Sequence, residues 1–260
     1  MNSERIAAID IGSNSVHLAI TEVSTHGRFK VLDSHKEVIR LASYLDDLKN
    51  ISQEGIERTI QALINMKALA SPYKPKFVAV ATQATRAAAN HEEFVRQLCR
   101  QTGIDVRVID GVEEAKLTFL GVRYSLPIDD CQTLELDIGG GSTEILIGSR
   151  TDTPFVISLP LGTVSLSKKF FGFKNAKKSD FDALKDHIAN EMKPYRDRIK
   201  QLKFDYAVAT SGTAKALATI NFQRQFGGNE KAPNGYAFRS KDIHKLLQDF
   251  VKLSSPNKRK

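Results

Sequence analysis

The sequence is poor in cysteine, and this scarcity excludes several classes of protein. Only Cys99 and Cys131 occur among its 260 residues, and neither belongs to a Cys-x-x-Cys pair or to a cluster of cysteine and histidine. A disulfide framework and a structural zinc site are therefore not expected. Two isolated thiols are typical of a protein from a reducing compartment, so a cytoplasmic location is expected.

Long apolar runs are also missing. No stretch of eighteen apolar residues exists, so no membrane-spanning helix is expected. The first residues, Met1–Arg5, lead directly into a strand-like segment, so no secretory signal peptide is expected. Hydrophobic residues make up 41% of the chain and charged residues 26%. This is an ordinary globular composition, and the chain is long enough for two domains.

Acidic residues are fewer than basic residues, and the formal net charge is +8. Much of the excess lies between Lys168 and Lys203, where eleven Lys and Arg residues stand against five Asp and Glu residues. Such a field favours a polyanionic partner such as a nucleotide, polyphosphate or nucleic acid. A charge run alone is more often a solvated helix face, so this partner needs support from other residues.

Hydrophobic patterning predicts an α/β protein in two halves. In the first half we expect strands at 6–10, 16–21, 29–39, 77–81 and 106–109, and helices at 51–70, 90–103 and 113–124. The pattern then restarts, with strands at 133–137, 144–148, 154–159 and 206–210, and helices at 163–170, 179–203, 213–220 and 240–253. The repetition predicts two domains, at residues 1–127 and 128–260.

A repeated hairpin motif is the feature that points to function. The string Asp-Ile-Gly-x-x-Ser stands between two apolar strands both at Asp10–Ser15 and at Asp137–Ser142. Glycine permits a positive φ angle and a close approach of backbone to ligand, and successive inward N–H groups in a tight turn bind anions. Either motif alone could be a plain hairpin turn. Together they predict phosphate-binding residues at Gly12, Ser13, Asn14, Ser15, Gly139, Gly140, Gly141, Ser142 and Thr143.

An aspartate ends the first strand of each hairpin, at Asp10 and Asp137. A carboxylate repels phosphate, so the expected role of each is to hold Mg²⁺, or another divalent cation, between carboxylate and phosphate oxygens. Two such domains facing a central cleft would hold a phosphate chain between them. This arrangement resembles the actin/sugar-kinase/heat-shock-chaperone superfamily, whose members have duplicated ribonuclease-H-like (actin-like ATPase) domains.

Within that superfamily the chain resembles the exopolyphosphatase/guanosine pentaphosphate phosphohydrolase (Ppx/GppA) family. The resemblance rests on five blocks, at residues 10–15, 81–90, 109–115, 137–144 and 211–215. It implies that Glu114 positions and activates the attacking water and that Arg86 contacts the phosphate being cleaved. It also implies metal binding by Asp137 and Glu144. The remaining phosphate contacts would come from the second hairpin and from the last block, at Gly212 and Thr213.

The resemblance predicts a hydrolase that releases terminal phosphate from inorganic polyphosphate or guanosine pentaphosphate. It makes a homodimer plausible, and no specific nucleic-acid binding is expected. Two departures stand out. Where family members usually have Arg-Leu-Gly-x-Gly-Leu, this chain has Arg40–Leu45 without either glycine, and the family's second domain normally continues past the helix at 240–253. The second domain is therefore expected to be incomplete at its C-terminus.

Simpler interpretations exist for the catalytic residues, and other functions stay open. Glu113 and Glu114 could be first-turn acids that complement a helix N-terminus, and Arg86 could be a surface arginine. A non-catalytic protein that binds polyphosphate or an alarmone nucleotide is one alternative, and the short C-terminus makes it plausible. A small-molecule kinase of the same fold is another, although the Glu-Glu-Ala helix start replaces the Asp base that such a kinase commonly uses.

Overall fold

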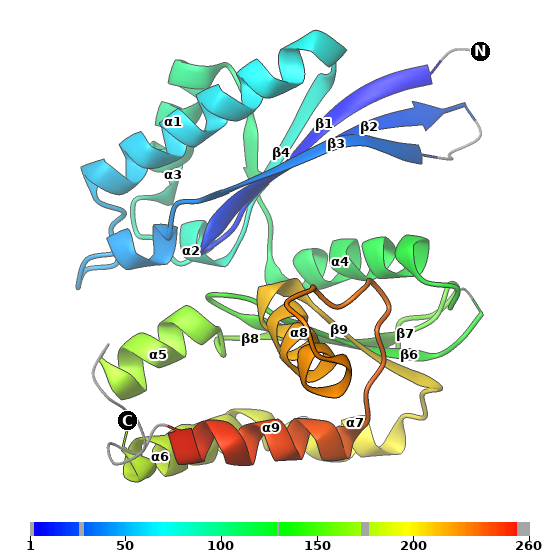
Figure 1. Cartoon of the computed structure of the whole chain (residues 1–260). Helices are drawn as coiled ribbons and strands as arrows, with labels where there is room; N and C mark the ends of the chain where they lie inside the picture. Colours follow the sequence, from blue (N-terminus) through cyan, green and yellow to red (C-terminus); the bar gives the residue numbers. More distant parts are fainter. Residues whose placement is uncertain (1–2, 26–28, 129, 173–176, 254–260) are drawn as a thin grey trace. The chain divides into compact units, whose positions relative to one another are not determined.

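The computed structural model describes residues 3–25, 29–128, 130–172 and 177–253. The chain divides into two compact units, Met1–Gly111 and Val112–Lys260, and each has its own sheet (Figure 1). The division lies earlier than the expected boundary after residue 127. Helix α4 (Gly111–Ser125) accounts for the difference, because its Ala115 and Phe119 pack against Leu146 of the second sheet.

The first unit contains a mixed sheet with the strand order β3-β2-β1-β4-β5. The strands are β1 (Ser3–Ile11), β2 (Ser15–Ser24), β3 (Phe29–Val38), β4 (Lys76–Ala81) and β5 (Val106–Val108). β1, β2 and β3 form an antiparallel meander, whereas β4 and β5 run parallel to β1. The predicted strands of the first half are therefore present, and the first hairpin joins β1 to β2 at the centre of the sheet.

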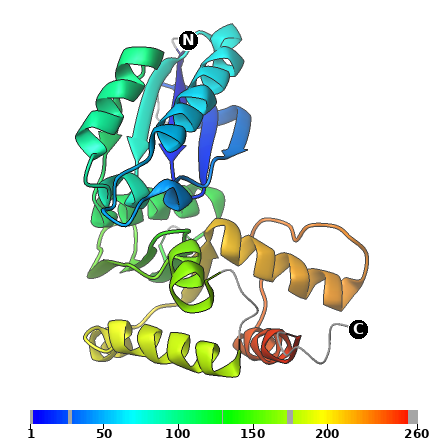
Figure 2. The ribbon, with the colours of Figure 1, turned by 90° about the vertical axis from the view of Figure 1, so that its left-hand side faces the viewer.

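One face of this sheet forms the core of the first unit. Side chains alternate along a strand, so Ile9 and Ile11 point to the same face as Leu18, and all three are buried. Helices α1 (Gln53–Ala70) and α3 (His91–Thr102) cover that face (Figure 2). Short turns complete the unit: the 3-10 helices η1 (Leu41–Tyr44) and η2 (Ser71–Tyr73), and the helix α2 (Gln83–Arg86). The other face of the sheet carries Asp10.

The second unit repeats this plan with the strand order β8-β7-β6-β9. Its strands are β6 (Thr133–Ile138), β7 (Thr143–Gly148), β8 (Phe155–Leu159) and β9 (Tyr206–Thr210). β6, β7 and β8 are antiparallel, and β9 runs parallel to β6, as β4 does to β1. The duplicated sequence pattern is thus a duplicated fold, and the predicted α/β class with two ribonuclease-H-like units is confirmed.

Helices lie on both faces of the second sheet. α5 (Thr163–Phe171), α6 (Lys178–Met192) and α7 (Arg196–Gln201) pack on the face formed by Leu134, Leu136, Ile145 and Ile147. α4 packs on the opposite face, and α8 (Ser211–Phe226) and α9 (Ser240–Leu253) follow β9. α4 therefore covers the side of the sheet that bears Asp137 and Glu144.

One predicted helix is wrong. A single helix was expected over 179–203, but the chain forms α6 and α7 with a break between Met192 and Arg196. The break contains Pro194, which has no N–H to donate to the carbonyl of Asn190 and whose ring disfavours helical backbone at the preceding residue. The segment is basic and amphipathic on both sides of the break, so its residue pattern resembles one continuous helix.

The structure also bears on the expectations about disulfides and membrane-spanning helices. Cys99 and Cys131 both carry free thiols, and Cys99 is exposed. In the ranges that the structure describes, every helix is too short or too polar to span a bilayer.

Candidate phosphate-binding site

The two hairpins share one internal hydrogen bond. The N–H of Gly12 donates to the carbonyl oxygen of Ser15 at 3.0 Å, and the N–H of Gly139 donates to that of Ser142, also at 3.0 Å. A Cβ atom on Gly12 would lie 3.2 Å from the Ser15 oxygen, and one on Gly139 would lie 3.3 Å from the Ser142 oxygen. Neither glycine has a positive φ angle. Close backbone approach, and not the left-handed conformation also considered, therefore explains glycine here.

The segment after β3 supports the first hairpin. The N–H groups of Ile39 and Arg40 donate to the carbonyl of Asn14 at 3.1 and 2.8 Å, and the N–H of Ala42 donates to the carbonyl of Ser13 at 2.9 Å. Within the described ranges, the N–H groups of Ser13 and Asn14 themselves donate to no other group of the chain. Occupied carbonyls and free N–H groups are the arrangement that an anion-binding turn requires.

The N-terminus of α5 supports the second hairpin in a similar way. The N–H of Thr163 donates to the carbonyl of Gly139 at 3.0 Å, and the N–H of Val164 donates to that of Gly140 at 2.8 Å. As far as the structure describes the chain, the N–H groups of Gly140 and Gly141 have no acceptor within it. The second hairpin therefore offers the same set of backbone donors as the first.

Gly162, which the motifs did not identify, holds α5 against the second hairpin. It precedes the first residue of α5, and a Cβ atom there would overlap the backbone N, Cα and C atoms of Gly141. Two backbones can approach this closely only where one residue has no side chain. A glycine directly before a predicted helix start was the available signal, but it does not reveal the contact with residue 141.

Most of the hydroxyl groups expected to bind phosphate already have partners in the chain. These contacts join Ser13 Oγ to Gln83 Oε1 at 3.2 Å, Ser15 Oγ to His17 Nε2 at 2.9 Å, and Thr143 Oγ1 to the carbonyl of Leu161 at 2.8 Å. Ser142 Oγ has no such partner in the described part of the chain, although the residue is only 4% exposed. Among the hydroxyl groups of the two hairpins, Ser142 is therefore the best placed to donate to a phosphate oxygen.

Asp10 lies on the uncovered face of the first sheet. It pairs across β1 and β2 with His17, which in turn pairs with Lys36 on β3. The three side chains line a hollow of about 420 Å³ on this face. The carboxylate of the first hairpin is therefore exposed and has basic side chains in its neighbourhood.

The second hairpin carries a buried group of carboxylates. Asp137 pairs with Glu144 across β6 and β7, and Glu135 points to the same face two residues earlier. Glu135 and Glu144 are 2% and 3% exposed, and Glu144 Oε1 accepts a hydrogen bond from Ser158 Oγ at 2.7 Å. In the described ranges, the buried atoms Glu135 Oε1 and Asp137 Oδ1 have no hydrogen-bond partner. These two oxygens lack the donors that buried carboxylates normally have.

The pKa values of these carboxyl groups reflect this shortage of donors. Burial raises the pKa of Asp137 above its usual range. Three neighbouring hydroxyl groups oppose this shift: those of Thr210, Ser211 and Thr118. Burial also raises the pKa of Glu135 to about 8, and the charges of Asp137 and Glu144 add to the effect. Sequence analysis missed Glu135, although its spacing from Asp137 in a strand places both on one face.

A divalent cation fits this carboxylate group. A cation would give the orphaned Asp137 Oδ1 a partner and relieve the repulsion between neighbouring acids. In the part of the chain that the structure describes, no three His, Cys, Asp or Glu side chains are grouped to hold a metal by themselves. The donor set therefore suits Mg²⁺, which keeps several waters and uses one or two carboxylates together with phosphate oxygens. Of the expected ligands, Asp137 and Glu144 lie in this unit and Asp10 in the other.

Glu114 lies on α4, the helix that covers these carboxylates. It is half-buried in the first turns of α4, and its carbonyl accepts a hydrogen bond from Thr118 Oγ1 at 3.1 Å. Residues four apart share a helix face, so the Glu114 side chain is on the face of α4 that carries Thr118. The Thr118 hydroxyl is one of the groups that lower the pKa of Asp137. Glu114 therefore lies one helical turn before a hydroxyl group that neighbours Asp137.

The remaining predicted residues lie on two other helices, Arg86 at the end of α2 and the others at the start of α8. Arg86 ends the short helix α2 of the first unit, and its Nη1 donates to the carbonyl of Ile109 at 2.7 Å. Gly212 and Thr213 form the first turn of α8, after Ser211, whose φ angle of 73° is unusual for a residue with a side chain. Such a conformation is often found at binding sites, where the surrounding structure holds it in place.

The fold and the site together define a class of protein. Duplicated ribonuclease-H-like units, each with an anion-binding hairpin between its first two strands, and an acidic group beside one of them form a scaffold for phosphate chemistry.

Comparison with known proteins gives the family. Residues 18–260 match the model of the Ppx/GppA phosphatase family, so the chain belongs to that family of hydrolases. An exopolyphosphatase from Cytophaga hutchinsonii has a similar structure, with a TM-score of 0.85, 27% identity, and coverage of 96% of this chain and 80% of that one. An Aquifex aeolicus family member gives a TM-score of 0.72 and 29% identity over 96% and 80%. A second Aquifex aeolicus structure, a type II variant of a Ppx/GppA phosphatase, gives 0.69 and 30% over 96% and 81%.

Proposed function

We propose that this protein hydrolyses the terminal phosphoanhydride bond of inorganic polyphosphate. The proposal rests on three features of the second unit: a hairpin with free N–H groups, the orphaned Asp137 Oδ1, and Glu114 on the helix that covers this face of the sheet. The similarity to an exopolyphosphatase supports polyphosphate as the substrate.

Glu114 is the group that would orient the attacking water and accept its proton. Phosphoryl transfer depends on positioning and charge neutralisation more than on covalent chemistry by the protein. The N–H groups of Gly140 and Gly141 and the hydroxyl of Ser142 would fix the phosphate. A carboxylate within hydrogen-bond reach of the water then acts as general base, an effect worth about 10²- to 10⁴-fold in rate.

A metal ion and an arginine would neutralise charge on the phosphate. Asp137 and Glu144 would hold Mg²⁺, which shields the negative oxygens when it is bound. Arg86 would contact the phosphate being cleaved through its guanidinium, which can bind two oxygens at once. Its Nη1 contact with Ile109 fixes one side of that guanidinium and limits how it can turn.

Substitution of Glu114 tests this mechanism, and its neighbour Glu113 provides the control. Glu114→Gln keeps the shape of the side chain but cannot accept the proton, so kcat should fall by about 100-fold or more while polyphosphate binding is retained. Glu113→Gln makes the same charge change on the same helix turn and should stay close to wild type. Phosphate release from long-chain polyphosphate gives kcat and KM for each. Full activity in Glu114→Gln would show that another group activates the water.

The choice of substrate needs a parallel measurement. Phosphate release from polyphosphate and from guanosine pentaphosphate should be compared with and without Mg²⁺. Preference for polyphosphate supports the proposal, whereas preference for the nucleotide assigns the same chemistry to a different substrate. Tight polyphosphate binding without phosphate release would instead indicate a binding protein. A requirement for an added acceptor would indicate a kinase.

A further inference from the structure

Residues 39–42 wrap around the carbonyl side of the first hairpin and are firmly anchored there. Besides the hydrogen bonds to Ser13 and Asn14 described above, Leu41 is completely buried and Ser43 Oγ donates to the carbonyl of Arg40 at 2.7 Å. The backbone of Arg40 is therefore fixed at a distance of one hydrogen bond from the phosphate-binding turn.

Arg40 adopts an unusual backbone conformation at this position. Its φ and ψ angles are 55° and 46°, in the left-handed region that glycine occupies more easily than a residue with a side chain. In this conformation its N–H and that of Ile39 both reach the carbonyl of Asn14. Lys49 and Lys74 also have positive φ angles, so the conformation alone does not mark a binding residue. What distinguishes Arg40 is its place beside the hairpin.

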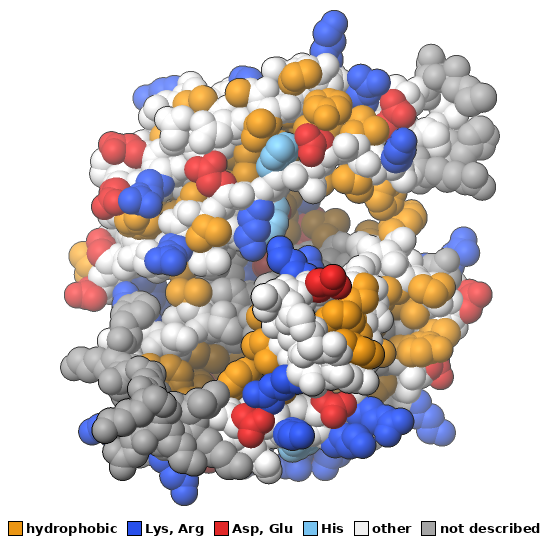
Figure 3. Space-filling view, viewed as in Figure 1, with side chains coloured by type: hydrophobic (Ala, Val, Ile, Leu, Met, Phe, Trp, Pro, Cys, Tyr) orange, Lys and Arg blue, Asp and Glu red, His pale blue; other side chains and the backbone are white. Residues whose placement is uncertain are grey.

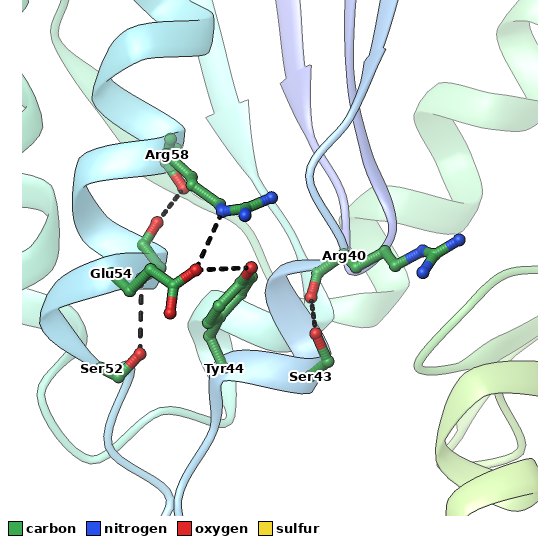
Figure 4. Close-up of polar contacts among 8 residues, drawn as sticks. Arg40, Ser43, Tyr44, Ser52, Glu54 and Arg58 are labelled. Carbon is green, nitrogen blue, oxygen red and sulfur yellow. Dashed lines mark hydrogen bonds and ion pairs between the residues drawn. The ribbon is translucent and has the colours of Figure 1, made fainter. Parts of the chain in front are cut away.

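The guanidinium of Arg40 is exposed, and it makes no ion pair or hydrogen bond within the ranges that the structure describes. Arg58, in the same neighbourhood, differs. Its Nε donates to Glu54 at 3.2 Å, and its guanidinium lies 5.4 Å from the centre of the Tyr44 ring. Figure 4 shows the Arg40 side chain extending away from this group. Arg40 therefore carries an unpaired cation on a backbone that is hydrogen-bonded to the first hairpin.

We infer that Arg40 binds the phosphate chain at the first hairpin, as a substrate-binding residue separate from the catalytic group on α4. The N–H groups of Ser13 and Asn14 are neutral donors, and the guanidinium would add charge and a two-pronged contact to phosphate oxygens. The inference rests on the proposed function, which identifies the bound phosphate chain as polyphosphate. It explains why an arginine occupies a backbone conformation that favours glycine.

Three variants separate binding from a merely structural role: Arg40→Gln, Arg40→Gly and the control Arg58→Gln. All three remove one positive charge, so long-range attraction of the substrate changes equally. Arg40→Gln should raise both the KM and the calorimetric Kd for long-chain polyphosphate about tenfold, with little change in kcat. Arg40→Gly should do the same while its Tm stays equal to or above that of wild type, because glycine relaxes the left-handed backbone. Arg58→Gln should leave KM and Kd unchanged.

The outcomes are distinct. Equal Kd values for Arg40→Gln and Arg58→Gln would overturn the inference, and a strongly lowered Tm in Arg40→Gly would assign Arg40 a structural role instead. If the wild type binds polyphosphate but releases no phosphate, and Arg40→Gln loses that binding, the proposed function fails and the inference stands. A wild type that does not bind polyphosphate at all would overturn both.

Discussion

Substitution of Gly162 offers a direct test of how the second hairpin is held. In Gly162→Ala the new methyl group would overlap the backbone of Gly141, and no flexible side chain is available to move aside. Overpacking of this kind costs about 1–3 kcal/mol, and the upper end applies where backbone meets backbone. The displacement would also weaken the α5 hydrogen bonds to Gly139 and Gly140, each worth about 1 kcal/mol. We therefore expect a loss of about 3–4 kcal/mol in the free energy of unfolding.

Two other glycines provide a graded comparison. A Cβ atom at Gly139 would lie 3.3 Å from the Ser142 carbonyl oxygen, a contact that a small shift relieves, so Gly139→Ala should cost about 1 kcal/mol. A Cβ atom at Gly212 would meet nothing within 4 Å, and alanine is favoured over glycine in a helix by about 0.5–1 kcal/mol. Gly212→Ala should therefore be neutral or slightly stabilising.

Urea unfolding followed by far-UV circular dichroism measures all three, since the chain has no tryptophan for fluorescence. The expected order of stability is Gly212→Ala, then Gly139→Ala, then Gly162→Ala. If Gly162→Ala unfolds within about 0.5 kcal/mol of wild type, the close contact with Gly141 does not support the hairpin, and this explanation is wrong.

The buried carboxylates lead to two further predictions. The pKa of Glu135 is about 8 in the folded state against 4.5 as its ordinary value, so the folded protein keeps a proton that the unfolded chain releases. The free energy of unfolding of the metal-free protein should therefore fall by several kcal/mol as pH rises from 5 to 9, at about 1.4 kcal/mol per pKa unit. Urea titrations at several pH values measure this pH dependence, and Glu135→Gln should largely abolish it. An unchanged slope would contradict the shift. Mg²⁺ should raise the Tm of wild type at pH 8 but not that of Asp137→Asn, and an equal rise in both would place the cation elsewhere.

The order of strands and helices and the duplication were readable from the sequence because both depend on local patterns. Alternating apolar residues placed β1, β2, β6 and β7, and the Asp-Ile-Gly-x-x-Ser string located both hairpins. The strand order within each sheet follows from these elements once the family resemblance is admitted. Local patterns did not reveal α2, whose four residues are too few to show helical spacing.

Contacts between distant residues were not predictable in this way. Asn90 directly precedes α3, but its side chain makes no capping bond. It accepts from the N–H of Ile51 at 2.8 Å and donates to the carbonyl of Ile51 at 2.9 Å. Gln83, in the block at 81–90, accepts a hydrogen bond from Ser13. Both residues stand in recognisable motifs, but the motif gives the residue type and not its partner.

The difference between the two hairpins suggests how the duplication was used. Both have the same internal hydrogen bond, but one is supported by a turn that carries a free arginine and the other by a helix N-terminus beside buried acids. A cation near the first hairpin strengthens the hold on a phosphate chain, whereas acids and Glu114 near the second suit bond cleavage with a metal. Each unit forms its hairpin with its own hydrogen bonds. The segment that supports one hairpin could therefore change without disturbing the segment that supports the other. Binding and catalysis could thus diverge between two copies of one motif, and changes at Arg40 should act on KM whereas changes at Glu114 act on kcat.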